Sequence, residues 1–378
     1  MLRGLKLESW RLGFYVYILL ANMVYGMYLV TSRDMVKSFM GFDYRFMTLL
    51  VAAENIPALF SIFGGGLGDV FGRRKTLFLG MLGAVPIFLM GVTGIDYLPV
   101  LASLYILLWS ISGPSVTGAL LDATGSSGIH YSLYAMFGTI GWGLGGPVAG
   151  ILTSRYGREI VFLLAGVSLF IGFLSAYIFF PRHAGGRGST PRDILHGARL
   201  VLPIFIAGTF AMAGLTLFFG NFSLILREAA GSPEVFGLVY TLLPAILGTI
   251  ARPVSGILSE KTKPINLALV AILTYIVLIL ALVYSSGILI FILWLIPVYP
   301  FIDQGFMMTI SRRLPRKLQA LAVGVWTTAM SFGGIIVLCL GFTPITSSIY
   351  TITAASETMF ILGGLTLVYT MLREKTGT

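Results

Sequence analysis

Long apolar blocks constrain the fold of this chain more than any other feature. Most of its 378 residues fall into apolar runs separated by short polar segments. The runs are about 17–25 residues long, and a helix of that length crosses the roughly 30 Å core of a bilayer. Only 11% of the residues are charged, against about 25% in soluble domains. The sequence therefore predicts an all-α integral membrane protein.

The apolar runs predict twelve membrane-spanning helices. The polar segment PRHAGGRGSTPRD follows the sixth of them and has the Gly, Pro, Ser and Thr content of a linker. We expect a six-helix bundle over 1–181, a cytoplasmic linker over 182–197 and a second six-helix bundle over 198–378. The expected spans are 12–31, 46–68, 76–94, 98–121, 130–153, 159–181, 198–222, 234–257, 264–284, 287–310, 318–341 and 349–371.

The lysines and arginines set the expected orientation. With the N-terminus inside, 18 of these 25 residues lie in inner segments and six in outer segments, which follows the positive-inside rule. The remaining one, Arg252, lies near the inner end of a span, and we expect its side chain to reach the surface. This predicts a multi-pass protein of the cell membrane with both termini in the cytoplasm. The net charge of +10 then implies contact with membrane lipids and no nucleic-acid partner.

Two polar segments at matching places point to an internal repeat. GGGLGDVFGRRKT, residues 64–76, follows the second span, and GILSEKTKP, residues 256–264, follows the eighth. Repeats of this kind are typical of transporter folds built from related halves. Three positions match at a constant offset of 191 residues: Gly65 with Gly256, Leu67 with Leu258, and Asp69 with Glu260.

The first segment, Gly65-x-Leu67-x-Asp69-x-x-Gly72-Arg73-Arg74-Lys75, resembles the loop signature of the major facilitator superfamily. The resemblance implies a secondary transporter whose two bundles rock around a central site, closed on the cytoplasmic side by a latch. By position, Asp69 would cap the helix that begins near Lys317–Gln319, and Arg73 would reach Asp122. The residues that we expect in this latch are Gly65, Asp69, Gly72, Arg73, Arg74, Asp122 and Glu260.

The fifth span contains FGTIGWGLGGPVAGIL, in which Gly146, Pro147 and Gly150 allow close helix packing and a bend. This segment partly resembles the glycine-proline motif of the proton-driven exporters of the same superfamily. Those exporters usually carry an arginine in the fourth span, whereas SLYILLWSISGPSVTGALL has no basic residue. An exporter signature and plain helix packing therefore both stay open.

Asp303 is the leading candidate for a proton, cation or substrate-amine site. Charged residues deep in spans are costly and usually functional. Asp303 lies nine residues before Arg312, which is about 14 Å along a helix. Pro297 and Pro300 precede it and can bend the helix. The alternative is a carboxylate that is satisfied by a neighbouring helix.

Three further residues are candidates for substrate binding or coupling. Glu54 lies in the outer half of the second span, where it either titrates during the transport cycle or pairs with an outer arginine such as Arg33. Asn22 and Tyr25 lie one helical turn apart in the first span. They can therefore share one face and form hydrogen bonds with a substrate.

The predicted function is secondary active transport of a small organic solute by a monomer. There is no G-x-x-x-x-G-K-[ST] nucleotide loop, so the energy must come from a gradient or from the solute. One cysteine and three histidines offer little for an active site, so we expect no enzyme activity, cofactor or metal. Proton coupling stays open. The alternatives are an ion-independent facilitator, a multidrug or metabolite efflux pump, and a membrane sensor that binds solute without transport.

Overall fold

The computed structural model describes residues 9–40, 44–181, 190–341 and 343–376, and these form helices and no strands. Helices satisfy their own backbone hydrogen bonds, which is required where lipid offers no partner. The α-helices are α1 (Ser9–Met40), α2 (Tyr44–Asn55), α3 (Ser61–Leu67), α4 (Arg73–Leu82), α5 (Ala84–Val92), α6 (Leu98–Ala123), α7 (Gly128–Tyr156), α8 (Arg158–Ile178), α9 (Pro191–Leu200), α10 (Leu202–Ala230), α11 (Pro233–Gly237), α12 (Leu243–Lys261), α13 (Pro264–Val283), α14 (Ile288–Trp294), α15 (Tyr299–Arg313), α16 (Gln319–Gly341) and α17 (Ile349–Thr376). The shorter 3-10 and π turns are η1 (Ile56–Phe60), η2 (Gly68–Gly72), η3 (Ile95–Tyr97), η4 (Leu238–Leu242), η5 (Arg316–Leu318) and η6 (Pro344–Ser347).

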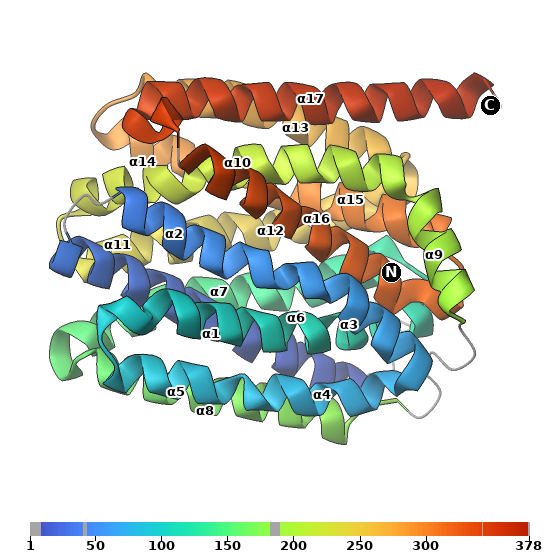
Figure 1. Ribbon diagram of the computed structural model, residues 1–378, viewed down its shortest axis with the longest axis horizontal. Coiled ribbons are helices and arrows are strands. Elements are labelled where there is room, and N and C mark those ends of the chain that lie inside the picture. The colour runs from blue at the N-terminus through green and yellow to red at the C-terminus, as the bar shows by residue number, and fades with distance from the viewer. Residues whose placement is uncertain (1–8, 41–43, 182–189, 342, 377–378) are drawn as a thin grey trace.

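Within the described ranges, eleven helical stretches are long and apolar enough to cross a membrane. The second stretch, Leu49–Val92, has 44 residues and covers the second and third expected spans together. Figure 1 shows α2 and α3 running in one direction and α4 and α5 running back in the opposite direction, on the far side of α6. The chain reverses at Gly72, which has a φ of +104°. The number differs from the expected twelve because the π turn η2 leads directly into α4.

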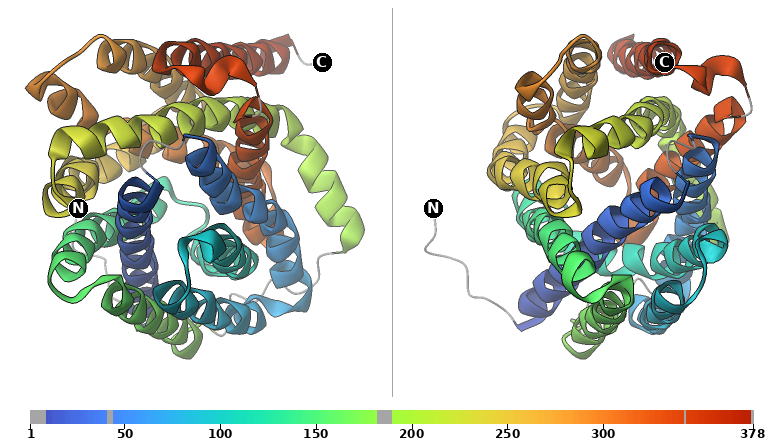
Figure 2. Two further views of the ribbon diagram at one scale, coloured as in Figure 1. Left: turned by 60° about the vertical axis from the view of Figure 1, so that its left-hand side comes forward. Right: turned by 90° about the vertical axis from the view of Figure 1, so that its left-hand side faces the viewer.

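Buried apolar side chains gather in two large clusters. One is built mainly from α1–α8 and the other mainly from α10–α17. The two groups of helices meet along two seams, visible in Figure 2. In one seam α16 packs against α2, α3 and α6, and in the other α7 packs against α11 and α12. These seams place residues that are distant in the sequence beside each other.

One end of the molecule carries α9 and the reversal at Gly72, and we call it the α9 end. The start of α1 and the end of α17 lie there as well (Figure 1). Near the middle of the chain's tenth expected span, helix is interrupted between α14 and α15. Pro297 has no N–H to donate and favours such a break. Asp303 follows in the second turn of α15.

Gly72 gives a first stability prediction. A residue with a side chain at a φ of +104° is strained by about 1–3 kcal/mol. Gly72→Ala should therefore lower the free energy of unfolding in detergent by that amount. Gly94→Ala is the control, because Gly94 has a φ of −70° and an added Cβ would meet nothing within 4 Å. Equal losses in both variants would contradict the strain argument.

Candidate functional site

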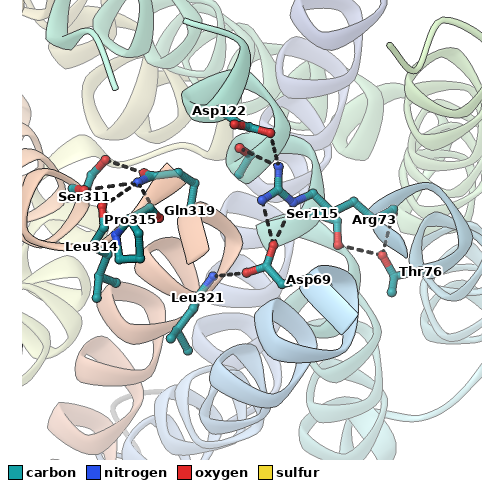
Figure 3. Close-up of polar contacts among 11 residues, drawn as sticks. Asp69, Arg73, Thr76, Ser115, Asp122, Ser311, Leu314, Pro315, Gln319 and Leu321 are labelled. Carbon is teal, nitrogen blue, oxygen red and sulfur yellow. Dashed lines mark hydrogen bonds and ion pairs between the residues drawn. The ribbon is translucent and has the colours of Figure 1, made fainter. Parts of the chain in front are cut away.

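Asp69 and Arg73 form a buried ion pair at the α9 end. Both side chains are 0% exposed, and Arg73 donates from Nε to Asp69 Oδ1 at 2.8 Å. The other carboxylate oxygen of Asp69 accepts the backbone N–H of Leu321 at 3.0 Å. Leu321 lies in the first turn of α16, where backbone N–H groups have no partner within the helix. Figure 3 shows that one carboxylate thus joins the reversal at Gly72 to α16.

Three of the seven expected latch residues, Asp69, Arg73 and Asp122, meet in this cluster. Arg73 donates to Asp122 at 3.3 Å, as expected, and to the carbonyl oxygen of Gly118 at 3.2 Å. Asp69 accepts the N–H of Leu321 in the first turn of α16, which begins at Gln319, and this is the helix that it was expected to cap. The side chain of Gln319 accepts from Ser311 and donates to the carbonyl oxygen of Leu314.

Two other expected latch residues have packing contacts. A Cβ added to Gly65 would collide with the carbonyl oxygen of Ala320 in α16, so glycine permits the close approach of α3 and α16. Arg74 points away from the cluster. It donates to the carbonyl oxygen of Tyr177 at 3.1 Å, and its guanidinium lies 4.4 Å from the centre of the Tyr177 ring.

Glu260 occupies an equivalent place in the second half of the chain. Its carboxylate accepts the backbone N–H of Gly128 at 2.6 Å, and Gly128 begins α7. Arg312 donates to the same carboxylate at 3.2 Å. Asp69 and Glu260, which correspond in the sequence repeat, therefore each bind the N-terminus of a helix on the other side of the linker.

A third contact at the α9 end joins α9 to η5. Lys317 donates to Asp193 at 2.9 Å, and the backbone N–H of Thr190 donates to the same carboxylate at 2.9 Å. These donors, the Thr190 N–H first, lower the pKa of Asp193 to about 2. The pair is partly exposed to solvent, so we expect it to contribute little to stability.

Asp303 lies at the centre of a second buried cluster. It is 5% exposed and forms an ion pair with Arg252 of α12. Trp326 of α16 donates from its indole N–H at 2.9 Å, and the hydroxyl of Tyr131 in α7 donates at 3.2 Å. The expectation that Arg252 reaches the surface is wrong. Arg252 is 6% exposed, because Asp303 supplies a charged partner inside the protein.

Glu54 lies in a third cluster, toward the end opposite α9. Arg33 donates from Nη2 to Glu54 Oε2 at 2.7 Å, so the expected pairing with an outer arginine is present. Tyr28 donates to the same carboxylate at 2.7 Å. The next residue after Arg33, Asp34, pairs with Arg227 of α10 at 3.0 Å. This second pair connects helices on the two sides of the linker.

Asn22 and Tyr25 contact different helices. Asn22 donates to the carbonyl oxygen of Ile18 at 3.0 Å and lies against Gly138 of α7. The ring of Tyr25 packs against Trp109 of α6, with ring centres 5.8 Å apart. In the part of the chain that the structure describes, Asn22 and Tyr25 therefore share no hydrogen-bonding partner.

The residues of the glycine-proline segment lie in the seam between α7 and α11. A Cβ added to Gly146 would lie 2.9 Å from the carbonyl oxygen of Gly237 in α11. Pro147 lies inside α7, and Gly150 is buried. These contacts are those expected from plain helix packing.

Sequence reasoning missed three partners of Asp303, namely Arg252, Tyr131 and Trp326. One signal was available. Arg252 is the single lysine or arginine that was assigned to neither an inner nor an outer segment, and a charge buried in a membrane protein normally has a partner of opposite charge. Tyr131 and Trp326 gave no such signal, because aromatic residues are common throughout the spans.

The Glu54–Arg33 pair gives a second stability prediction. Glu54→Gln leaves the buried guanidinium of Arg33 without its counter-charge, which should cost about 3–5 kcal/mol of unfolding free energy. Glu159→Gln is the control, because Glu159 is 58% exposed and lies 3.7 Å from Arg158. That exposed pair should contribute at most about 1 kcal/mol. Similar unfolding curves for both variants in detergent would contradict the prediction.

Comparison with solved structures shows the fold. A bacterial homologue of the iron transporter ferroportin, crystallised in an outward-facing state with soaked iron, matches with a TM-score of 0.70 at 13% identity, over 97% of this chain and 99% of that chain. The human organic anion transporter MFSD10 (TETRAN) matches with a TM-score of 0.65 at 14% identity, over 95% of this chain and 99% of that chain. No curated protein matches the sequence.

The family profile of the Major Facilitator Superfamily matches residues 11–338. The matched region includes the latch cluster, the Asp303 cluster and the Glu54 cluster. The apolar helices of the structure are those of a multi-pass membrane protein. The chain therefore belongs to the major facilitator superfamily, a family of membrane transporters.

Proposed function

We propose that this protein is a secondary active transporter that moves a small organic solute by alternating access, coupled to protons through Asp303. In this proposal twelve spans form two six-helix bundles, 1–181 and 198–378, joined by the linker 182–197. A monomer acts in the cell membrane with both termini in the cytoplasm. The α9 end is then the cytoplasmic end.

The environment of Asp303 is the observation that carries the proposal. Its carboxylate is bound by Arg252 and Trp326 from the second bundle and by Tyr131 from the first. When the bundles separate at the cytoplasmic end, α7 moves away from α15, so the Tyr131 hydrogen bond is lost and water reaches the carboxylate. A carboxylate whose hydrogen bonds and contact with water differ between the two conformations is suited to carry a proton from one side of the membrane to the other.

Aromatic rings from both bundles favour the proposal that the solute is organic. Tyr25 packs near Trp109 in the first bundle, and Tyr240 packs against Trp294 in the second, with ring centres 5.6 Å apart. Trp142 of α7 lies near Tyr240, with ring centres 6.3 Å apart, so aromatic rings of the two bundles meet. This region lies between the Glu54 and Asp303 clusters. Rings with hydroxyl groups suit a solute with an apolar body and a few polar groups.

The charged groups favour an organic solute over a metal ion. Glu54 and Asp303 are each neutralised by an arginine. A carboxylate beside a guanidinium is a poor ligand set for a divalent cation, which requires several oxygen or nitrogen donors. An anionic solute, the kind named for the human organic anion transporter, would bind either arginine by taking the place of its carboxylate partner.

Flux into liposomes tests the function. The purified protein is reconstituted, a library of small organic anions, cations and zwitterions is presented, and internal solutes are measured with and without a pH gradient. Flux stimulated by the gradient supports the proposal. Flux that changes neither with the pH gradient nor with an added protonophore supports an ion-independent facilitator. The preferred direction of flux distinguishes uptake from efflux. A solute that binds the protein without crossing the membrane would indicate a sensor and contradict transport.

A further inference from the structure

An apolar groove runs along the lipid-facing side of α1 and α7. Its volume is about 420 Å³. The stacked rings of Tyr15 and Phe137, 4.7 Å apart, form part of its wall. The remaining lining residues are Arg11, Leu12, Val16, Leu19, Leu20 and Leu133.

The length of the groove matches one leaflet of a bilayer. Its lining begins at Arg11 and extends along α1 to Leu20, nine residues or about 14 Å at the rise of an α-helix. One leaflet is half of the roughly 30 Å hydrocarbon core. The groove therefore has the polarity and length to hold one acyl chain.

Two basic side chains stand at the α9 end of the groove. Arg11 Nε and His130 Nδ1 are buried and have no hydrogen-bond partner in the part of the chain that the structure describes. His130 lies in the first turn of α7 and three residues before Leu133, a lining residue, so both are on the same face of the helix. The acid bound near this place is Glu260, and Arg312 and the Gly128 N–H already bind its carboxylate. An anionic group at this place would therefore meet unused donors and no unneutralised acid.

We propose that this groove is a binding site for an anionic phospholipid of the inner leaflet. One acyl chain lies between α1 and α7 against Val16, Leu19 and Leu133, and the phosphate accepts hydrogen bonds from Arg11 and His130. The site does not depend on which solute the protein transports. It places a lipid between α1 and α7, two helices of one bundle, on the side that faces the membrane.

Native mass spectrometry of the delipidated protein tests the site. Phosphatidylglycerol and phosphatidylcholine with identical acyl chains are offered at equal concentration, and the ratio of the two bound lipids is measured. The wild type should retain more phosphatidylglycerol. Arg11→Gln should lower the ratio about fivefold, the contribution of one cation near a membrane surface. Lys263→Gln is the matched control, because Lys263 is an exposed cation at the start of α13, and it should leave the ratio unchanged.

A second variant tests the groove itself. Val16→Trp fills the groove, so it should reduce retention of both lipids while its thermal unfolding stays near that of the wild type. Glycerol phosphate, which has no acyl chain, should not compete with phosphatidylglycerol. The proposal is overturned if Arg11→Gln keeps the wild-type ratio, if Lys263→Gln lowers it equally, if a folded Val16→Trp retains lipid normally, or if glycerol phosphate displaces the lipid.

Discussion

Asp303→Asn should abolish gradient-driven transport and lower the free energy of unfolding by about 3–5 kcal/mol. The stability loss arises because Arg252 stays buried, at 6% exposed, without its counter-charge. Asparagine still offers an oxygen to Trp326 and Tyr131, so those hydrogen bonds can survive. Transport is lost because an amide cannot bind and release the proton. Unfolding in detergent and flux in liposomes measure the two effects separately.

A double variant separates the structural role of Asp303 from its role in coupling. Arg252→Gln/Asp303→Asn removes both charges, so no unpaired ion is left in the interior, and much of the lost stability should return. Proton-driven flux should stay absent. Recovery of pH-dependent flux in the double variant would show that the pair is structural and that the proton binds elsewhere. Glu54 would then be the next candidate.

The contacts of Asp69 with α16 and of Arg73 with Asp122 could be predicted because the segment resembles the loop signature of the superfamily, whereas the direct pairing of Asp69 with Arg73 was not predicted. Asp69 and Arg73 are one helical turn apart, and Glu260 repeats the position of Asp69. The helix that Asp69 binds is the expected one, but which of the unpaired N–H groups in its first turn is the donor could not be predicted; in the structure it is the N–H of Leu321.

The surroundings of Asp303 could not be predicted because they depend on the rotation of helices about their axes. Arg252 and Asp303 are 51 residues apart, and an apolar span gives few clues to which side faces the interior. The same limit explains Asn22 and Tyr25, which were expected on one face and contact α7 and α6 respectively. The charged segment predicts a reversal of the chain near Gly72. It does not predict that helical structure continues up to that residue.

Asp69→Asn should open the α9 end of the protein. The variant removes the charge that pairs with Arg73 and weakens the acceptor for the Leu321 N–H, and a hydrogen bond to a charged group contributes about 1.5–3 kcal/mol. The equilibrium between closed and open forms should therefore shift by about tenfold or more. Hydrogen–deuterium exchange of a peptide covering the start of α16 reports this directly, because the Leu321 N–H is the donor, and its exchange should accelerate by that factor.

The matched control for the latch is Asp193→Asn, which removes an equal charge at the same end. Asp193 binds Lys317 at 2.9 Å, yet that pair is partly exposed, so exchange at the start of α16 should change little. Gly65→Ala should act in the same direction as Asp69→Asn, since its Cβ would push α3 away from Ala320. If exchange accelerates equally in Asp193→Asn, the effect is one of net charge. If it accelerates in neither carboxylate variant, the buried pair does not hold the α9 end closed, and the contact of Glu260 with α7 becomes the next candidate for that role.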